Sequence, residues 1–252
     1  NADVNIGTVP AGVTPIAIAV NPITNTIYIV NFGSGNVTVI DGQDHTTATV
    51  TAGLGARAVA VNIVTNRVSI PNIDAGTVTV INGADNSTTT VTAGTQPFAV
   101  AVNPVTNRAY VCNYGSNSVT VINGSDNSTV TVPAGTMPFS IAVNPVTNRI
   151  YVANGGSNSV TVINGADNST ETVTTPPVPV ALAVNPVTNK IYVANSDNSS
   201  VTIIDGSSLA KVTIPTGTEP RSVAVNPVTN RIYVGNASSS NVTVIDGSDY
   251  TT

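Results

Sequence analysis

Short runs of alternating apolar and polar residues follow one another along the whole chain, and each run ends at Asn, Gly, Pro or Asp. Four kinds of run recur in a fixed order, exemplified by residues 98–102 (FAVAV), 149–154 (RIYVAN), 160–163 (VTVI) and 88–92 (TTTVT). Two-residue alternation between such turn residues predicts short antiparallel strands joined by hairpins. No segment carries a 3.6-residue apolar period long enough for a helix, so a helical repeat is excluded.

Two markers give the repeat length. The first is NPVTN, which begins at residues 103, 144, 185 and 226, with variants at residues 21 (NPITN) and 62 (NIVTN). The second is VTVI or VTII, which begins at residues 37, 78, 119, 160, 201 and 242. Both recur every 41 residues, and four strands in a repeat of this length are typical of a propeller blade. Residues 1–252 are therefore predicted to form one all-β domain, a six-bladed β-propeller with four antiparallel strands per blade.

The two ends of the chain suggest how the ring closes. Residues 5–12 align with residues 87–94, which belong to the fourth strand of a blade, yet no blade precedes them. The sixth repeat stops at Thr252, where its own fourth strand would start, and Asp249 lies six repeats after Asp3. We therefore expect residues 5–12 to supply the outer strand of blade six beside Val242–Ile245, which would close the ring.

Blade two departs most from the repeat. Ser69 stands where the other blades have Tyr, Pro71 lies in the second strand, and Ile63 replaces the turn proline. The blade is expected to form, with altered strand pairing near Pro71, because proline cannot donate to a strand ladder.

The second-strand segments at residues 150–154 and 191–195 (IYVAN), with NPVTN before them and VTVI or VTII after them, resemble the repeats of YVTN β-propellers. The resemblance covers essentially the whole chain. It implies the propeller fold and an extracellular or cell-surface location, because this family occurs in archaeal and bacterial cell-surface and surface-layer proteins. It implies no particular activity, because propellers serve many unrelated functions.

Composition narrows the classes of function. The formal net charge is −5 and the eight Lys and Arg residues are scattered, which argues against a nucleic-acid partner. No apolar run approaches the roughly 18 residues of a membrane span, so no membrane insertion is expected. One Cys and one His, Cys112 and His45, leave no Cys metal cluster and no Ser-His-Asp triad on the candidate face described next. We expect no metal and no cofactor.

Comparison of the six copies separates residues that build the blade from residues that could bind a partner. The turn Asn residues and the second-strand Asn residues are the same in all copies, and we assign them to the structure. The loops before the first strand and after the second strand share one face of a propeller, and here the copies differ. The variable candidates on this face are Phe32, Arg57, Asp74, Phe98, Tyr114, Met137, Phe139, Asp197, Glu219 and Arg221.

An apolar mouth with a few polar groups is the usual pattern of a binding site, so these residues are candidates for contact with a protein or glycan partner. The alternative is that Phe98 and Phe139 only close the channel and that the charged residues are solvated. Asp74 and Asp197 lie in blades two and five, too far apart for an acid/base pair. We expect a non-enzymatic binding module. The other two hypotheses are a structural surface unit that self-associates through outer strands with uncharged edges, at residues 88–92 and 130–132, and a metal-assisted hydrolase or lyase.

Overall fold

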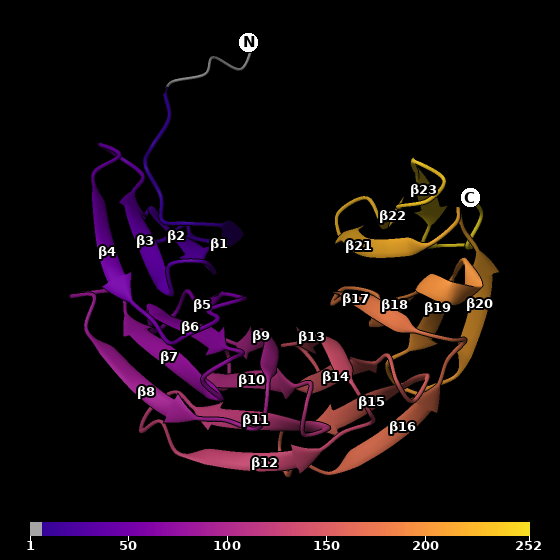
Figure 1. The fold of residues 1–252 in the computed structure, drawn as a ribbon. Coiled ribbons are helices and arrows are strands. Elements are labelled where there is room, and N and C mark those ends of the chain that lie inside the picture. The colour runs from indigo at the N-terminus through magenta and orange to yellow at the C-terminus, as the bar shows by residue number, and fades with distance from the viewer. Residues whose placement is uncertain (1–6) are drawn as a thin grey trace.

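The computed structural model describes residues 7–252, which form six antiparallel sheets in chain order (Figure 1). Five sheets have four strands and the sixth has three, each in sequence order. The only helix among the described residues is one 3₁₀ turn, η1 (Ser196–Asn198). The prediction of an all-β, six-bladed propeller built on a 41-residue repeat is confirmed.

Each blade is a meander. The first strands lie nearest the centre and are β1 (Pro15–Asn21), β5 (Ala60–Asn62), β9 (Pro97–Asn103), β13 (Pro138–Asn144), β17 (Pro179–Asn185) and β21 (Pro220–Asn226). The second strands are β2 (Thr26–Asn31), β6 (Arg67–Asn72), β10 (Arg108–Asn113), β14 (Arg149–Asn154), β18 (Lys190–Asn195) and β22 (Arg231–Asn236). The third strands are β3 (Asn36–Asp41), β7 (Thr77–Asn82), β11 (Ser118–Asn123), β15 (Ser159–Asn164), β19 (Ser200–Asp205) and β23 (Asn241–Asp246). The outer strands are β4 (Thr47–Thr51), β8 (Thr88–Thr92), β12 (Thr129–Pro133), β16 (Thr170–Thr174) and β20 (Lys211–Pro215).

The core lies between blades. Because side chains alternate across a strand, each sheet has two apolar faces, and we call the face toward the next blade the leading face and the other the trailing face. Between blades three and four, Tyr110, Val119 and Val121 of the leading face pack against Ile141 and Ile150 of the trailing face. The equivalent residues pack in the same way between the other neighbouring blades. The ring is therefore held by five copies of one interface.

Asparagine side chains tie the same interfaces. In blades one to five, the Asn that ends the first strand donates from Nδ2 to Oδ1 of the turn Asn of the next blade, as in Asn144 to Asn189 at 2.8 Å. The same bond joins Asn21 to Asn66, Asn62 to Asn107, Asn103 to Asn148 and Asn185 to Asn230, at 2.8–2.9 Å. The turn Asn residues have φ between 51° and 53°, the left-handed region that Asn tolerates. The turn Asn residues are therefore structural, as expected from the sequence. The hydrogen bond that they accept from the neighbouring blade was not expected.

The second-strand Asn residues are structural as well. Asn154 is buried and donates from Nδ2 to Thr161 Oγ1 on the third strand at 2.9 Å. Asn31, Asn72, Asn113, Asn195 and Asn236 make the equivalent bond at 2.9–3.0 Å. A buried amide that donates within its own sheet stabilises the blade.

Blade two forms as expected, and its altered pairing lies beside Pro71. That proline stays in register with Val78 of β7, but β5 is only three residues long. N-terminal to β5, the remaining pairing with the second strand is an isolated bridge between Ala56 and Asn72. Pro71 has no N–H to donate to the first strand, so the ladder between the first and second strands is interrupted beside it.

Within residues 7–252, the closure expected from the sequence is not formed. The sixth sheet ends at β23, and residues 7–14 form no strand. Residues 5 and 6 of the expected closing segment lie outside the described residues. Figure 1 shows an open arc, with a gap between the sheet of β1 to β4 and the sheet of β21 to β23.

Candidate functional site

The loops that carry the variable residues are joined by one repeated backbone bond. In each blade this bond joins the loop before the first strand to the loop after the second strand. The acceptor is the carbonyl oxygen at the position of Gln96, and the donor is the N–H of the residue that follows the second-strand Asn. In blade three, Tyr114 N–H donates to Gln96 O at 2.9 Å. The other five blades repeat the bond at 2.9–3.0 Å. The two variable loop positions of each blade are therefore neighbours on one face.

The accepting residue is left-handed in every blade. Gly55 has φ 71°, whereas Thr14, Gln96, Met137, Val178 and Glu219 have φ between 53° and 58° without being glycine. A left-handed residue with a Cβ costs about 1–2 kcal/mol, and such strain often marks functional positions. Five blades thus keep a side chain on this face where glycine would fit the backbone better.

Four of the candidates meet in one cluster that spans blades two to four. The rings of Phe98 and Phe139 lie 5.0 Å apart edge to face, and Tyr114 lies 5.8 Å from Phe98 and 5.3 Å from Phe139. The Arg57 guanidinium carbon stands 3.9 Å from the centre of the Phe98 ring. All four side chains are half-buried. We call Arg57, Phe98, Tyr114 and Phe139 the aromatic cluster.

Offset and edge-to-face rings attract one another, and a guanidinium over a ring adds about 0.5–2 kcal/mol. Arg57 makes no ion pair within the described residues. Its charge therefore remains available to an acceptor from outside. A half-buried apolar platform beside an unpaired guanidinium can stack a planar or sugar ring and bind an anionic group next to it.

Met137 and Asp74 lie close to this cluster. A Cβ on Gly156 would stand 3.1 Å from Met137 Sδ, so the exposed thioether lies over that loop of blade four. Asp74 lines an open hollow of about 500 Å³ between blades two and three, together with Gln96 and Ser116. Gln96 was not among our candidates, although it varies between copies at a position we compared.

Glu219 and Arg221 bind each other instead. Arg221 Nε donates to Glu219 Oε1 at 3.0 Å, and the Ser238 hydroxyl donates to the other carboxylate oxygen. The Ser238 hydroxyl and then Arg221 lower the pKa of Glu219. This pair lies in blade six, beside the gap of Figure 1.

The last two candidates stand apart. The Phe32 ring makes no ring contact with the described aromatic residues, and it belongs to blade one. Asp197 is exposed in η1 of blade five and forms no salt bridge within the described residues. The structure thus brings together four of the ten candidates, with two more at their border.

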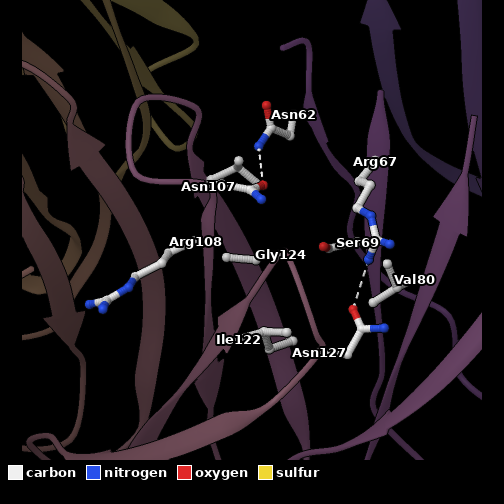
Figure 2. A pocket seen from close by; sticks show the side chains of 11 residues that line it. Asn62, Arg67, Ser69, Val80, Asn107, Arg108, Ile122, Gly124 and Asn127 are labelled. Atoms are coloured by element: carbon white, nitrogen blue, oxygen red, sulfur yellow. Dashed lines mark hydrogen bonds between the residues drawn. The ribbon is translucent and has the colours of Figure 1, made fainter. Parts of the chain in front are cut away.

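A small cavity lies toward the opposite face. It lies between blades two and three, has a volume of about 20 Å³, and is lined by Ser69, Ala109, Ile122 and Gly124 among others (Figure 2). Arg67 crosses it and donates to Asn127 Oδ1 at 2.9 Å. A space of this size holds about one water molecule, so we assign it to packing rather than to a ligand.

The described residues lack two further features. No group of three or more His, Cys, Asp or Glu side chains is arranged to hold a metal ion there. No helix among these residues is long and apolar enough to span a membrane.

No protein-family model and no curated protein matches the chain. Two similar solved structures are both β-propeller proteins. Kuenenia stuttgartiensis hydrazine synthase superposes with a TM-score of 0.60 at 18% identity over all of both chains. The dihydro-heme d1 dehydrogenase NirN in complex with DHE superposes with a TM-score of 0.77 at 14% identity, over 92% of this chain and 54% of that one. At such identities the likeness shows the fold alone: the chain is a β-propeller.

Proposed function

We propose that this chain is a non-enzymatic binding module of an extracellular or cell-surface protein. Its partner, a protein or a glycan, contacts the face of the loops before the first and after the second strands. The aromatic cluster carries the proposal, because it concentrates three rings and an unpaired guanidinium on a chain with only 4% aromatic and 8% charged residues. Interfaces are enriched in the same residue types, aromatic residues and Arg.

The chemistry of the cluster selects the partner. Phe98, Phe139 and Tyr114 offer apolar ring edges and faces, which suit the apolar face of a sugar or the side chain of an aromatic residue. Arg57 adds a donor for a carboxylate or sulfate, and Asp74 lies at the adjacent hollow. An acidic glycan or an acidic peptide with an aromatic residue fits this combination. The YVTN-like repeats support the proposed surface location.

The test is a binding screen of the chain against an array of neutral and acidic oligosaccharides and of acidic peptides with and without aromatic residues. We expect acidic binders whose affinity falls at least about tenfold in Phe98→Ala and in Arg57→Ala. Val146→Ala, in an exposed turn of the opposite face, is the matched control and should bind like the parent. The absence of any binder, or equal losses in Val146→Ala, would refute the proposal.

One observation supports a second function, a structural unit of a surface layer. The outer strands are mostly exposed, and those of blades one to three, β4, β8 and β12, carry no charged residue, as at Thr88–Thr90 of β8. Such edges pair readily with other strands. Under this hypothesis the chain forms higher assemblies in sedimentation, Thr89→Lys breaks them, and Phe98→Ala leaves them intact.

A further inference from the structure

The second strand begins with a basic residue in five blades, and blade one is the exception. The basic residues of blades two to six are Arg67, Arg108, Arg149, Lys190 and Arg231. Blade one has Thr26 at this position, directly opposite Asp41, the residue that ends the third strand. Blade one therefore carries an acidic residue opposite a position that holds no base.

The other two blades with an acid at the end of the third strand neutralise it. Lys190 Nζ lies 2.8 Å from Asp205 Oδ2 in blade five, and Arg231 lies 3.1 Å from Asp246 Oδ2 in blade six. Asp41 forms no ion pair within the described residues. It is a carboxylate without the cation that its equivalents have.

Where the third strand ends in Asn, the arginine reaches across to the next blade. Arg108 of blade three donates to Gly165 O of blade four at 2.7 Å. Arg149 of blade four donates to Gly206 O of blade five at 2.9 Å. The guanidinium at this position thus has a fixed acceptor, a glycine carbonyl of the neighbouring blade.

The same acceptors are present in blade two, within the phase of Thr26. Gly83 O is the equivalent of the two glycine carbonyls, and Asn86 Oδ1 is the equivalent of Asn127 Oδ1, which accepts from Arg67. Neither Gly83 O nor Asn86 Oδ1 accepts a hydrogen bond within the described residues. Blade two therefore offers two acceptors for which blade one supplies no donor.

These groups line one open hollow on the face opposite the aromatic cluster. It lies between blades one and two, has a volume of about 250 Å³, and is lined by Thr26, Val39, Asp41, Gly83, Asn86 and the start of β4. At the next interface, the equivalents of four of these residues line the cavity of Figure 2, where Arg67 crosses the space and only about 20 Å³ remains. The hollow is the arginine site of this interface without an arginine, and it is several times larger than the roughly 30 Å³ of one liquid water.

The tyrosine next to the hollow lacks the same positive charge. Burial raises the pKa of Tyr110 in blade three, and Arg108 partly offsets that rise. The corresponding tyrosine and arginine of blade four behave in the same way. Burial alone raises the pKa of Tyr28, whose hydroxyl would stand 2.6 Å from a Cβ on Gly83. A guanidinium in the hollow would restore the environment that Tyr110 has.

We propose that this hollow binds a guanidinium group supplied from outside the chain, either on an arginine residue of a partner protein or on a free guanidino compound. Asp41 neutralises the charge, while Gly83 O and Asn86 Oδ1 accept N–H groups of the guanidinium. Guanidinium has five N–H donors in one plane and serves several acceptors at once, whereas the ammonium of lysine is a compact point charge. The site is separate from the aromatic cluster and does not depend on the partner placed there.

A titration of the ¹⁵N-labelled chain followed by nuclear magnetic resonance tests the proposal. The probes are N-acetylarginine amide, its neutral isostere N-acetylcitrulline amide, N-acetyllysine amide, and a glycine-serine peptide with one central arginine. We expect the Gly83 amide signal to shift and saturate with N-acetylarginine amide, and binding of the citrulline and lysine probes to be at least about threefold weaker. The peptide distinguishes the two sources, because it saturates the shift only if the site accepts an arginine within a polypeptide.

Two acidic residues of one loop provide the matched pair of variants. Asp41→Asn should weaken binding of N-acetylarginine amide about three- to fivefold, the strength of an exposed ion pair. Asp44→Asn removes the same charge from the same loop, but the Asp44 carboxylate already accepts the N–H and the hydroxyl of Thr46. Its variant should bind like the parent, and so should Phe98→Ala on the other face.

Thr26→Arg supplies the guanidinium from within the chain. Thr26→Gln is its control, because both variants lose the hydroxyl that donates to Thr24 O. We expect Thr26→Arg to abolish the saturable shift of Gly83 and to unfold at a higher urea concentration than Thr26→Gln. The Asp41→Asn titration stands by itself should Thr26→Arg fail to fold.

Four results would overturn the proposal. The absence of a saturable shift at Gly83 would mean that the hollow holds only solvent. Equal binding of the arginine and citrulline probes would show that the hollow does not recognise the charge, and equal binding of the lysine probe would show that it takes any cation. Equal losses in Asp41→Asn and Asp44→Asn would assign the effect to net charge. Unchanged binding in folded Thr26→Arg would place the guanidinium elsewhere.

Discussion

Replacing Ser69 by tyrosine tests the repeated interface at the place where the chain departs from it. Tyr28 reaches across to blade two, where a Cβ on Gly83 would stand 2.6 Å from its hydroxyl. One repeat later the equivalent residues are Ser69 and Gly124, and both line the cavity of Figure 2. The residue opposite is Ala109, where most blades have Ile. The cavity is therefore the remainder of a tyrosine site.

The expected gain is modest. Full burial of a tyrosine removes about 150–250 Å² from water, or about 4–6 kcal/mol. Arg67 already fills much of the site and the free space is only about 20 Å³, so we take roughly half of that gain, about 2–3 kcal/mol. The buried hydroxyl costs about 1 kcal/mol or more, because the tyrosine hydroxyls of blades one, three, four and five find no well-aligned hydrogen-bond partner among the described residues. The net expectation for Ser69→Tyr is about 1 kcal/mol, or about 2 °C in Tm.

Thermal and urea unfolding of Ser69→Tyr and Tyr151→Ser form the matched experiment. Tyr151→Ser opens the same site in blade four and should cost about 3–4 kcal/mol, several times the gain at position 69. In Ser69→Tyr, Arg67 should leave Asn127 and donate to Gly124 O, as Arg108 donates to Gly165 O. Destabilisation by Ser69→Tyr would show that Arg67 and its neighbours have closed the site, and would refute the reasoning.

Three further changes test other parts of the structure. Asn144→Ala should lower the free energy of unfolding in urea by about 1–3 kcal/mol, because it breaks the hydrogen bond between two blades. Asn226→Ala should lower it less, because Asn226 makes no such bond within the described residues, and equal losses would contradict this account. Val178→Gly should raise stability by about 0.5–1 kcal/mol by relieving a left-handed residue, and a loss would show that the side chain contributes more through packing. Lys190 and nearby N–H groups lower the pKa of Asp205 below its unfolded value, so its stabilising effect is present above about pH 4 and is lost as the pH falls toward the folded pKa. Asp205→Asn should therefore lower the free energy of unfolding at pH 7 and reduce its decrease below about pH 4. If that decrease is unchanged in Asp205→Asn, this carboxylate does not contribute to the loss of stability in acid.

The sequence predicted the blades almost completely, because strand identity depends on local alternation and on turn residues that recur without insertion. It did not predict the curvature of the ring. Tyr233 and Val242 have the same chemistry as their buried equivalents, and a face of Tyr and Val packs on a face of Ile at any of several angles between blades. The expected closure by residues 5–12 assumed an angle that brings blade six to blade one, and the five interfaces of the structure do not adopt it.

The candidate site was predicted in part, for a similar reason. Variation between copies identified Arg57, Phe98, Tyr114 and Phe139, and their contact follows from neighbouring blades in fixed phase. Arg221 varies as much but lies next to Glu219, two residues away, and the two neutralise each other. Variation shows which positions the blade leaves free, and only the geometry shows which of them meet.

The loop geometry explains how this one face can vary while the fold is kept. The bond between the two variable loops uses only backbone atoms, so its formation does not depend on either side chain, as in Tyr114 N–H to Gln96 O. On the opposite face the bonds between blades use asparagine side chains, so substitution there removes a contact of the ring itself. Replacing loop residues should therefore change binding at little cost in stability, whereas replacing turn residues should do the reverse. Aromatic residues and arginine have accumulated in and next to the loops joined by this backbone bond, and this is the face at which we place the partner.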